Sequence, residues 1–347
     1  MEQEITVSGY ALLGESLETR PVTLVIKSGI ITRIEDEPHP PGRWIVPAFF
    51  NAHTHLADTV TMDIPARGDL ESLVTPPDGL KHRMLRQASH RDLVSGIRAS
   101  ARAMLEGGTA GCADFREGGI EGVRTIETAA RPILPGLVVF GRDGGETIAE
   151  GLGISSARDV PDVDARVAEA RKNGKLVAFH AGEQDPSDID SALSYSPDLL
   201  IHCTHASRAQ LKSCADHGIP IAICPRSNWA LGVTNSNANP PVQEMIELGC
   251  HVLLGTDNAM FVQPDMFSEM SFACHVYHVS PEFLLGSAIS GSSLTGNSYY
   301  IRKGSNARFF VLDPGRLNLR FSHDIRQSIV KRGFSGAIVK KVFIFKS

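Results

Sequence analysis

The middle of this 347-residue chain alternates short apolar runs with stretches of helical periodicity, and this alternation constrains the fold more than any other feature. Such alternation is typical of parallel βα units. The expected strands cover residues 45–51, 110–115, 133–140, 151–154, 176–180, 199–202, 220–224 and 252–256. Amphipathic patterns predict helices, most of them between those strands, over residues 92–106, 160–172, 208–217, 241–248 and 265–277. We therefore predict an α/β fold, a (β/α)8 TIM-like barrel, in which the short run at 151–154 completes eight strands.

The two ends of the chain have a different texture. Short strand-like runs broken by turn residues occupy both ends, for example residues 22–26 and 30–34 around a Lys-Ser-Gly turn. This pattern is typical of small antiparallel strands. We expect residues 1–46 and 305–347 to form one small β-sandwich domain and residues 47–304 to form the catalytic barrel. The polar segment 58–81, which follows the first barrel strand, is long enough to act as a lid.

Composition narrows the class of protein. A hydrophobic share of 42%, a charged share of 21% and a net charge of -5 are those of a soluble globular protein. No basic run that would follow phosphates occurs, so we expect no nucleic-acid partner. The start of the chain shows neither a signal peptide nor a membrane span, so we expect a cytoplasmic protein without a membrane partner. The six cysteines form no CxxC pair and are expected to be buried free thiols. A homo-oligomer is compatible with the sequence.

Polar residues that could bind a metal or move a proton stand where four of the expected strands end. They are His53 and His55, His180 and Glu183, His202 and His205, and Asp257. Each has an ordinary structural reading when taken alone, because a histidine can sit in a core and an aspartate can cap a helix. Their joint position favours an active site, since the carboxyl ends of barrel strands form one face where active sites are built.

The motifs around these residues are more specific than the residues alone. Residues 47–55 read PAFFNAHTH, residues 255–258 read GTDN, and residues 264–270 read PDMFSEM. Together they resemble the amidohydrolase superfamily, in the deaminase and chlorohydrolase branch that includes cytosine, guanine and S-adenosylhomocysteine deaminases. Residues 180–183, HAGE, and 224–228, CPRSN, are shared in form with adenosine deaminases. The resemblance spans nearly the whole chain.

The resemblance implies a ligand set and a cofactor. It makes His53, His55, His180 and Asp257 the metal ligands, a set of imidazole and carboxylate groups that suits Zn²⁺ and is compatible with Fe²⁺. A cation of this kind lowers the pKa of a bound water from about 15.7 towards 7. Asp257 could be both ligand and proton acceptor.

The same resemblance implies roles for two further residues. Glu183 would protonate the ring nitrogen next to the carbon under attack, which makes that carbon a better electrophile. His202 would orient the water and stabilise the developing charge on oxygen. His205, three residues further on, is the competing candidate for that role.

Members of the superfamily with two metals usually carry a carboxylated lysine on the fourth strand. No lysine occurs between Lys81 and Lys172, so one divalent metal ion is favoured, although Glu150 could take the place of a bridging group.

Candidate substrate contacts lie next to the same strand ends. We expect them at Arg116, Arg142, His205, Ser227 and Asn228, with structural arginines as the alternative reading for the first two.

These observations predict a metal-dependent hydrolase acting on C–N bonds other than peptide bonds. The expected reaction is the hydrolytic deamination of an aminated heterocycle, a purine base, nucleoside or nucleoside-like metabolite, with release of ammonia. A triazine-type chlorohydrolase and a cyclic amide hydrolase are alternatives from the same superfamily. A non-catalytic metal-binding barrel is the alternative from another class, but it would have no use for Glu183 and His202.

Overall fold

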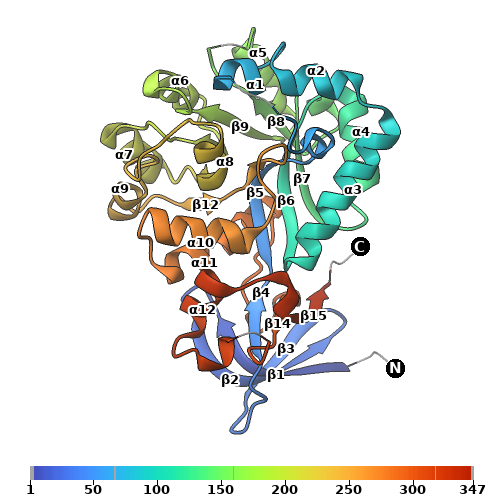
Figure 1. Cartoon of the computed structure of the whole chain (residues 1–347), viewed down its shortest axis with the longest axis vertical. Coiled ribbons are helices and arrows are strands. Elements are labelled where there is room, and N and C mark those ends of the chain that lie inside the picture. Colours follow the sequence, from blue (N-terminus) through green and yellow to red (C-terminus); the bar gives the residue numbers. More distant parts are fainter. Residues whose placement is uncertain (1–3, 66–67, 159, 317, 345–347) are drawn as a thin grey trace.

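The computed structural model describes residues 4–65, 68–158, 160–316 and 318–344. The outermost residues of the predicted terminal domain, and residues 66–67 of the predicted lid, lie outside this description. Two sheets organise the described chain, a nine-stranded one in the middle of the sequence and a six-stranded one built from both ends (Figure 1).

The nine-stranded sheet is parallel throughout and curls on itself. Its strands are β5 (Phe49–His55), β6 (Thr109–Arg116), β7 (Gly136–Gly141), β8 (Gly151–Ile154), β9 (Leu176–Ala181), β10 (Leu199–His202), β11 (Ile221–Ile223), β12 (Val252–Leu254) and β13 (Asp257–Asn258). They follow the order β12-β11-β10-β9-β8-β7-β6-β5-β13. Only two residues separate β12 from β13, which lie at the two ends of that order, so the sheet must bend until its first and last strands come together. The predicted α/β fold with a parallel sheet is confirmed.

Side chains fasten the point where the sheet meets itself. The Asn51 amide donates a hydrogen bond to the Thr256 hydroxyl at 2.7 Å, and the Thr256 N–H donates to the His53 carbonyl at 3.1 Å. Both side chains are fully buried. β5, β6 and β7 are buried along their whole length, as expected for parallel strands that are covered on both faces. The short run at 151–154 forms β8 with the predicted bounds.

The described chain has twelve α-helices; all but the last surround the curled sheet in Figure 1, and the last lies beside the six-stranded sheet. They are α1 (Leu70–Val74), α2 (Leu80–Gln87), α3 (His90–Glu106), α4 (Gly119–Ala130), α5 (Val163–Lys172), α6 (Ile189–Ser194), α7 (Arg208–His217), α8 (Pro225–Ala230), α9 (Val242–Glu247), α10 (Met266–Val276), α11 (Pro281–Ser290) and α12 (Ile325–Arg332). Local sequence explains several boundaries. Ser207 and Gln210 form a capping box at the start of α7, and Gly218, in the left-handed conformation, ends it.

Helix α4 was not predicted, because its sequence begins with glycines, which are poor helix formers. The structure gives a steric reason for one of them. A Cβ atom on Gly122 would lie 1.8 Å from the Glu117 carbonyl oxygen, so the first turn of the helix approaches the end of β6 too closely for any side chain.

The six-stranded sheet joins both ends of the chain. Its strands are β1 (Glu4–Leu13), β2 (Glu18–Lys27), β3 (Ile30–Asp36), β4 (Trp44–Pro47), β14 (Arg308–Leu312) and β15 (Ile338–Phe343), in the order β15-β14-β4-β1-β2-β3. β4 lies between β1 and β14, so strands from opposite ends of the sequence are neighbours. β4 leads through Ala48 directly into β5, and the first strand of the curled sheet is therefore anchored to the terminal sheet.

Two smaller predictions can be compared with the structure. All six cysteines are buried and free of disulfides, as predicted. Among the described residues, no helix combines the length and the apolar character that crossing a membrane requires.

Candidate active site

A cavity of about 810 Å³ opens at the carboxyl ends of the strands of the curled sheet. Its wall includes residues from seven strand ends and from the segment that carries α1 and α2, which covers one side of the opening. The predicted residues that reach the cavity surface are His55, Arg116, Arg142, His180, Glu183, His202 and Asp257. His53 lies directly beneath them and is fully buried.

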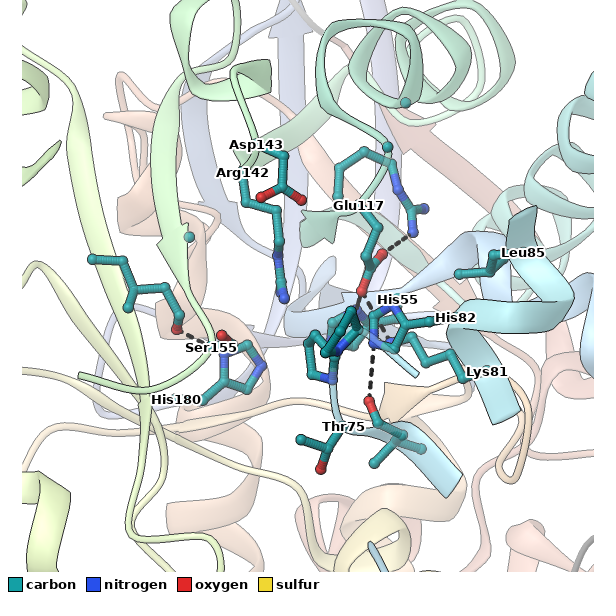
Figure 2. A pocket seen from close by; sticks show the side chains of 18 of the residues that line it. His55, Thr75, Lys81, His82, Leu85, Glu117, Arg142, Asp143, Ser155 and His180 are labelled. Carbon is teal, nitrogen blue, oxygen red and sulfur yellow. Dashed lines mark hydrogen bonds and ion pairs between the residues drawn. The ribbon is translucent and has the colours of Figure 1, made fainter. Parts of the chain in front are cut away.

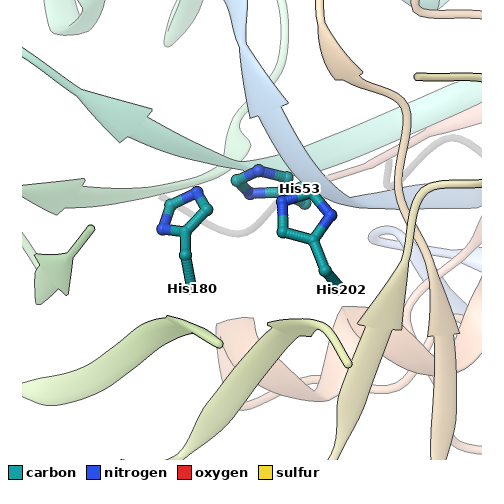
Figure 3. A group of neighbouring side chains, drawn as sticks. All are labelled: His53, His180 and His202. Atoms are coloured by element: carbon teal, nitrogen blue, oxygen red, sulfur yellow. The ribbon is translucent and has the colours of Figure 1, made fainter. Parts of the chain in front are cut away.

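Four imidazole rings and one carboxylate converge at the floor of this cavity. His53 Nε2 lies 3.1 Å from Asp257 Oδ1, and His55 Nε2 lies 3.6 Å from the same oxygen. The His53 ring centroid is 4.9 Å from that of His180 and 5.7 Å from that of His202. Figure 3 shows the rings of His53, His180 and His202 gathered at the strand ends. Such spacing lets several nitrogen and oxygen atoms reach one cation.

The protonation of these histidines suits metal binding. Burial lowers the pKa of His53 to about 4, against the opposing effect of Asp257, and burial lowers the pKa of His55 to about 3. Both rings are therefore neutral near pH 7, which is the form that binds a metal. His180 Nδ1 lies 3.1 Å from the Ile154 carbonyl oxygen, so a proton on Nδ1 leaves Nε2 available as a ligand.

Two further observations fit a cation at this place. The buried Nδ1 atoms of His53 and His202 have no hydrogen-bond partner among the described residues. Two overlapping groups bring their ligand atoms within 4.8 Å of one another, His53 with His180 and His202, and His53 with His55 and Asp257. A mixed set of imidazole nitrogen and carboxylate oxygen atoms is the kind of donor set that Zn²⁺ takes in catalytic sites.

Asp257 and His202 hold unusual backbone conformations. Their φ angles are 60° and 75°, in the left-handed region that non-glycine residues rarely adopt. Conformations of this kind cost about 1–3 kcal/mol each and cluster at active sites. The Ser227 hydroxyl donates to Asp257 Oδ2 at 2.6 Å and fixes the carboxylate. Burial raises the pKa of Asp257, but its contact with His53 outweighs burial and holds that pKa well below its usual range.

Glu183 is brought to the cavity by a tight turn after β9. Gly182 has a φ of 69°, and its N–H donates to Asp188 Oδ1 at 2.8 Å. A Cβ atom on Gly182 would lie 2.5 Å from the Ile189 side chain, so glycine is required on both grounds. Glu183 Oε1 lies 3.6 Å from His202 Nε2, and burial raises the pKa of the Glu183 carboxyl.

Three residues that sequence reasoning missed lie behind His55. Lys81, from the first turn of α2, is buried, and its Nζ lies 3.0 Å from Asp58 Oδ2 and 3.1 Å from Glu117 Oε1. Glu117 Oε1 lies 3.1 Å from His55 Nδ1 (Figure 2). The position of Glu117 directly after an apolar strand could have revealed it. Lys81 could not be found that way, because a 25-residue segment separates it from the nearest strand end.

The remaining predicted residues have different surroundings. Arg116 is fully buried, lies 3.4 Å from Asp114 Oδ1 and forms a second ion pair with Glu117, so its charge is already matched. Arg142 follows β7 and lines the cavity. Contacts of these two arginines with substrate stay predictions.

Three polar residues after β10 and β11 were expected near substrate. His205 Nε2 lies 3.3 Å from the Val233 carbonyl oxygen, and the residue is not among those that line the cavity in the described chain. Asn228 donates from Nδ2 to the Thr204 hydroxyl at 2.7 Å, and Ser227 supports Asp257. Their roles towards substrate stay predictions.

Glu150 was considered as a bridge to a second metal. It immediately precedes β8, at the end of the strand opposite the cavity, where it contacts Arg131 and accepts a hydrogen bond from the Val139 N–H at 3.0 Å. This position gives it no access to the metal-binding side chains.

Comparison with known proteins places the chain among aminohydrolases. The family model for adenosine deaminase matches residues 90–292. A putative aminohydrolase of Methanothermobacter thermautotrophicus is 31% identical, over 98% of this chain and 97% of that protein. A 5-methylthioadenosine/S-adenosylhomocysteine deaminase of Halobacterium salinarum is 25% identical, over 93% and 87%.

The fold has solved counterparts. The structure of a mutant atrazine chlorohydrolase from Arthrobacter aurescens, complexed with zinc and atraton, matches with a TM-score of 0.81 at 14% identity, covering 97% of this chain and 95% of that one. At this identity the likeness concerns the fold.

Proposed function

The chain belongs to the adenosine deaminase family, within the amidohydrolase superfamily, and on that premise we propose that it is a mononuclear metal-dependent aminohydrolase. Its substrate is an aminated heterocycle, a purine base, nucleoside or nucleoside-like metabolite, which it deaminates with release of ammonia. One observation carries the proposal: a carboxyl group with a raised pKa, Glu183, lies 3.6 Å from His202 at the cavity that also holds the imidazole and carboxylate cluster. A metal site with a purely structural role needs no such acid.

We infer that the curled sheet is a closed (β/α)8 barrel in which β12 and β13 are two parts of the eighth strand. The pairing of β13 with β5 supports this reading. On the same reading, residues 47–304 are the catalytic barrel. Residues 1–46 and 305–347 form the small β-sandwich domain, of which the six-stranded sheet is the described part.

His53, His55, His180 and Asp257 would hold a single divalent ion, with Zn²⁺ favoured over Fe²⁺. The neutral imidazoles and the unpartnered His53 nitrogen support this ligand set. When bound, the ion supplies Lewis acidity that makes hydroxide accessible near neutral pH.

The protein's own residues then move the protons. Glu183, in its protonated form, donates to the ring nitrogen beside the amino-bearing carbon, so electron density can flow onto that nitrogen as a C–O bond forms. His202 lies next to Glu183 and stabilises negative charge on the attacking oxygen. Asp257 accepts a proton from the water. The C–N bond then breaks, the amino group takes up the proton held by Asp257 and leaves as ammonia, and the oxygen stays on the ring while its second proton restores Glu183.

Lys81 and Glu117 act as positioning residues in this scheme. Glu117 Oε1 lies within 3.1 Å of both the Lys81 ammonium and His55 Nδ1, so it fixes the orientation of the imidazole. Carboxylates that hold a metal-binding histidine in this manner raise its basicity and its affinity for the ion.

The test is an ammonia-release assay with one protein preparation in three states: as purified, stripped with a chelator, and reloaded with Zn²⁺. We expect ammonia from at least one adenine, guanine or cytosine derivative, loss of activity after chelation, and recovery with Zn²⁺. Chloride release from chlorotriazines or ring opening of cyclic amides, without ammonia, would contradict the proposal. Zinc binding without turnover of any of these compounds would favour the non-catalytic barrel.

A further inference from the structure

Arg142 is a buried cation whose charge is unmatched. It follows β7 directly, is 9% exposed and lines the cavity. Within the described chain its side chain forms neither a hydrogen bond nor an ion pair, and its Nε atom is buried without a partner. Figure 2 shows the side chain extending into the space between His180 and His55.

The other buried cations of the cavity wall are matched. Lys81 lies against Asp58 and Glu117, and Arg116 lies against Asp114 and Glu117. The three neighbouring buried carboxylates therefore already form ion pairs with these two cations. Asp143, the residue after Arg142, also borders the cavity, but it is exposed and no ion pair joins the two among the described residues.

An unmatched buried guanidinium is costly, because a charge removed from water needs an opposite charge or several hydrogen bonds to compensate. The charge of Arg142 affects the pKa values of two neighbouring histidines. After burial and nearer charges, Arg142 also contributes to lowering the pKa of His82 and of His180. The cavity thus presents a positive potential at this point and lacks the anion that would balance it.

The cavity has room for a substrate larger than a bare base. Its volume of about 810 Å³ lies in the upper part of the range for small-molecule sites, roughly 300–1,000 Å³. The floor is formed by the proposed metal ligands, and Arg142 rises from a different strand end. A ring placed at the floor could therefore carry an arm that reaches Arg142.

We propose that Arg142 forms an anion subsite, and that the substrate carries an oxyanion group, carboxylate or phosphate, on an arm attached to the deaminated ring. This rests on the proposed function, because it names the class of substrate for the same site. A guanidinium binds both groups through paired N–H donors, so the two sources share one chemistry.

Kinetics with matched substrates test the subsite. We would compare adenosine, its 5′-carboxylate and its 5′-phosphate, with the guanosine equivalents alongside, using zinc-loaded protein. Wild type should show a kcat/KM at least about 10-fold higher for an anionic compound than for the neutral nucleoside. Arg142→Met should reduce that ratio by about 10- to 100-fold, the scale of a lost charged hydrogen bond. Arg142→Lys should retain part of the preference.

Arg86→Met is the matched control. Arg86 also borders the cavity, but its side chain is 57% exposed and pairs with Asp78 at 3.5 Å. This variant should keep the preference for the anion, which would show that the loss in Arg142→Met does not come from a general change in charge. The comparison of the 5′-carboxylate with the 5′-phosphate shows which oxyanion the subsite binds.

Binding measurements separate this inference from the deaminase proposal. Calorimetry would compare inosine, its 5′-carboxylate and its 5′-phosphate, which cannot be deaminated. If no compound released ammonia but wild type, unlike Arg142→Met, bound the anionic forms more tightly, the subsite would stand and the deaminase proposal would fail. If ammonia were released with no preference for an anion in either assay, the subsite would be wrong and the deaminase would stand.

Discussion

Two buried polar clusters adjoin at His55, and they differ in how their charges are matched. The metal cluster consists of His53, His55, His180 and Asp257. The charge cluster consists of Asp58, Lys81, Asp114, Arg116 and Glu117. In the charge cluster each cation contacts two carboxylates. In the metal cluster burial keeps His53 and His55 neutral near pH 7, and no lysine or arginine of the described chain pairs with the Asp257 carboxylate.

The difference separates a site that needs a ligand from one that supplies its own counter-charges. Burial raises the pKa of Asp114 to about 6, but Lys81, His55 and Arg116 outweigh burial at Glu117 and hold its pKa well below the usual range. Lys81 likewise keeps a raised pKa because Asp58 and Glu117 overcome the effect of burial. On the proposed function, the charge cluster supports the site and the metal cluster is the part that binds the ion and reacts.

The largest effect should come from breaking the metal cluster. Asp257→Asn removes the carboxylate that lies near both His53 and His55. We expect loss of bound metal and a fall in turnover of roughly 10³-fold or more, since the ion's Lewis acidity is worth several kcal/mol. Elemental analysis and ammonia release measure both. Asp216→Asn, on the exposed surface of α7, is the control. Full metal content in Asp257→Asn would contradict its role as a ligand.

A second substitution separates catalysis from metal binding. Glu183→Gln should leave metal content intact and reduce turnover by roughly 10²-fold or more, the scale of general acid catalysis. Because burial raises the pKa of Glu183, its carboxyl stays protonated up to a higher pH than usual. The kcat/KM of the wild type should fall once the pH rises above that pKa. The glutamine variant should lack this alkaline limb. A loss of metal instead would make Glu183 a ligand.

Lys81→Met tests whether the charge cluster supports the metal cluster. It leaves Asp58 and Glu117 without their shared cation, and Glu117 should then hold His55 less firmly. We expect Zn²⁺ affinity to fall by about 10- to 100-fold in chelator competition, as for other groups that orient metal-binding histidines. Lys81→Arg should restore part of it.

The control is Lys175→Met, because Lys175 bonds only to the carbonyls of Thr147 and Ala149 in the described chain. Circular dichroism would confirm folding of each variant. A Lys81→Met protein that is less stable but binds Zn²⁺ as tightly as wild type would show that the charge cluster is structural only.

The smallest effect concerns His82, which neighbours Lys81 but belongs to neither cluster. Burial lowers its pKa from 6.5 to about 4, and its Nε2 lies 3.0 Å from the Val74 carbonyl oxygen. Between pH 6.5 and about 4, His82 binds a proton in the unfolded chain but stays neutral in the folded chain. The free energy of unfolding therefore falls as the pH drops towards 4. For metal-free protein, His82→Gln should remove about 2 kcal/mol of that loss at pH 5 in urea titrations. An unchanged pH profile would contradict this assignment.

The sequence predicted those parts of the molecule that follow a local rule. Apolar runs predicted the strands, and the polar residues at or just after their ends, such as His180 and Asp257, do meet at one cavity. The amphipathic pattern predicted a helix over residues 208–217, which are the bounds of α7, and the capping box at Ser207 with the glycine at 218 explains them. Their convergence could be predicted because the carboxyl ends of parallel strands share one edge.

Contacts that depend on the path of a long segment could not be predicted. The segment 58–81 was expected to act as a lid, but nothing in its composition indicated that Lys81 would be buried between two carboxylates. Arg116 and Arg142 looked equivalent in the sequence, as arginines near neighbouring strand ends. Only the placement of Asp114 and Glu117 shows that the first is matched and the second is not.

The junction of Asn51 with Thr256 bears on the order in which the molecule assembles. These two residues are 205 positions apart, and the proposed ligands His53 and Asp257 are 204 apart. Contacts so distant in sequence form late, because the chain loses the conformational entropy of the loop between them before the contacts contribute any favourable free energy. Newly made chains therefore bring the two proposed ligands together only when the last strand joins the first, and we expect metal uptake to mark the end of folding rather than to begin it.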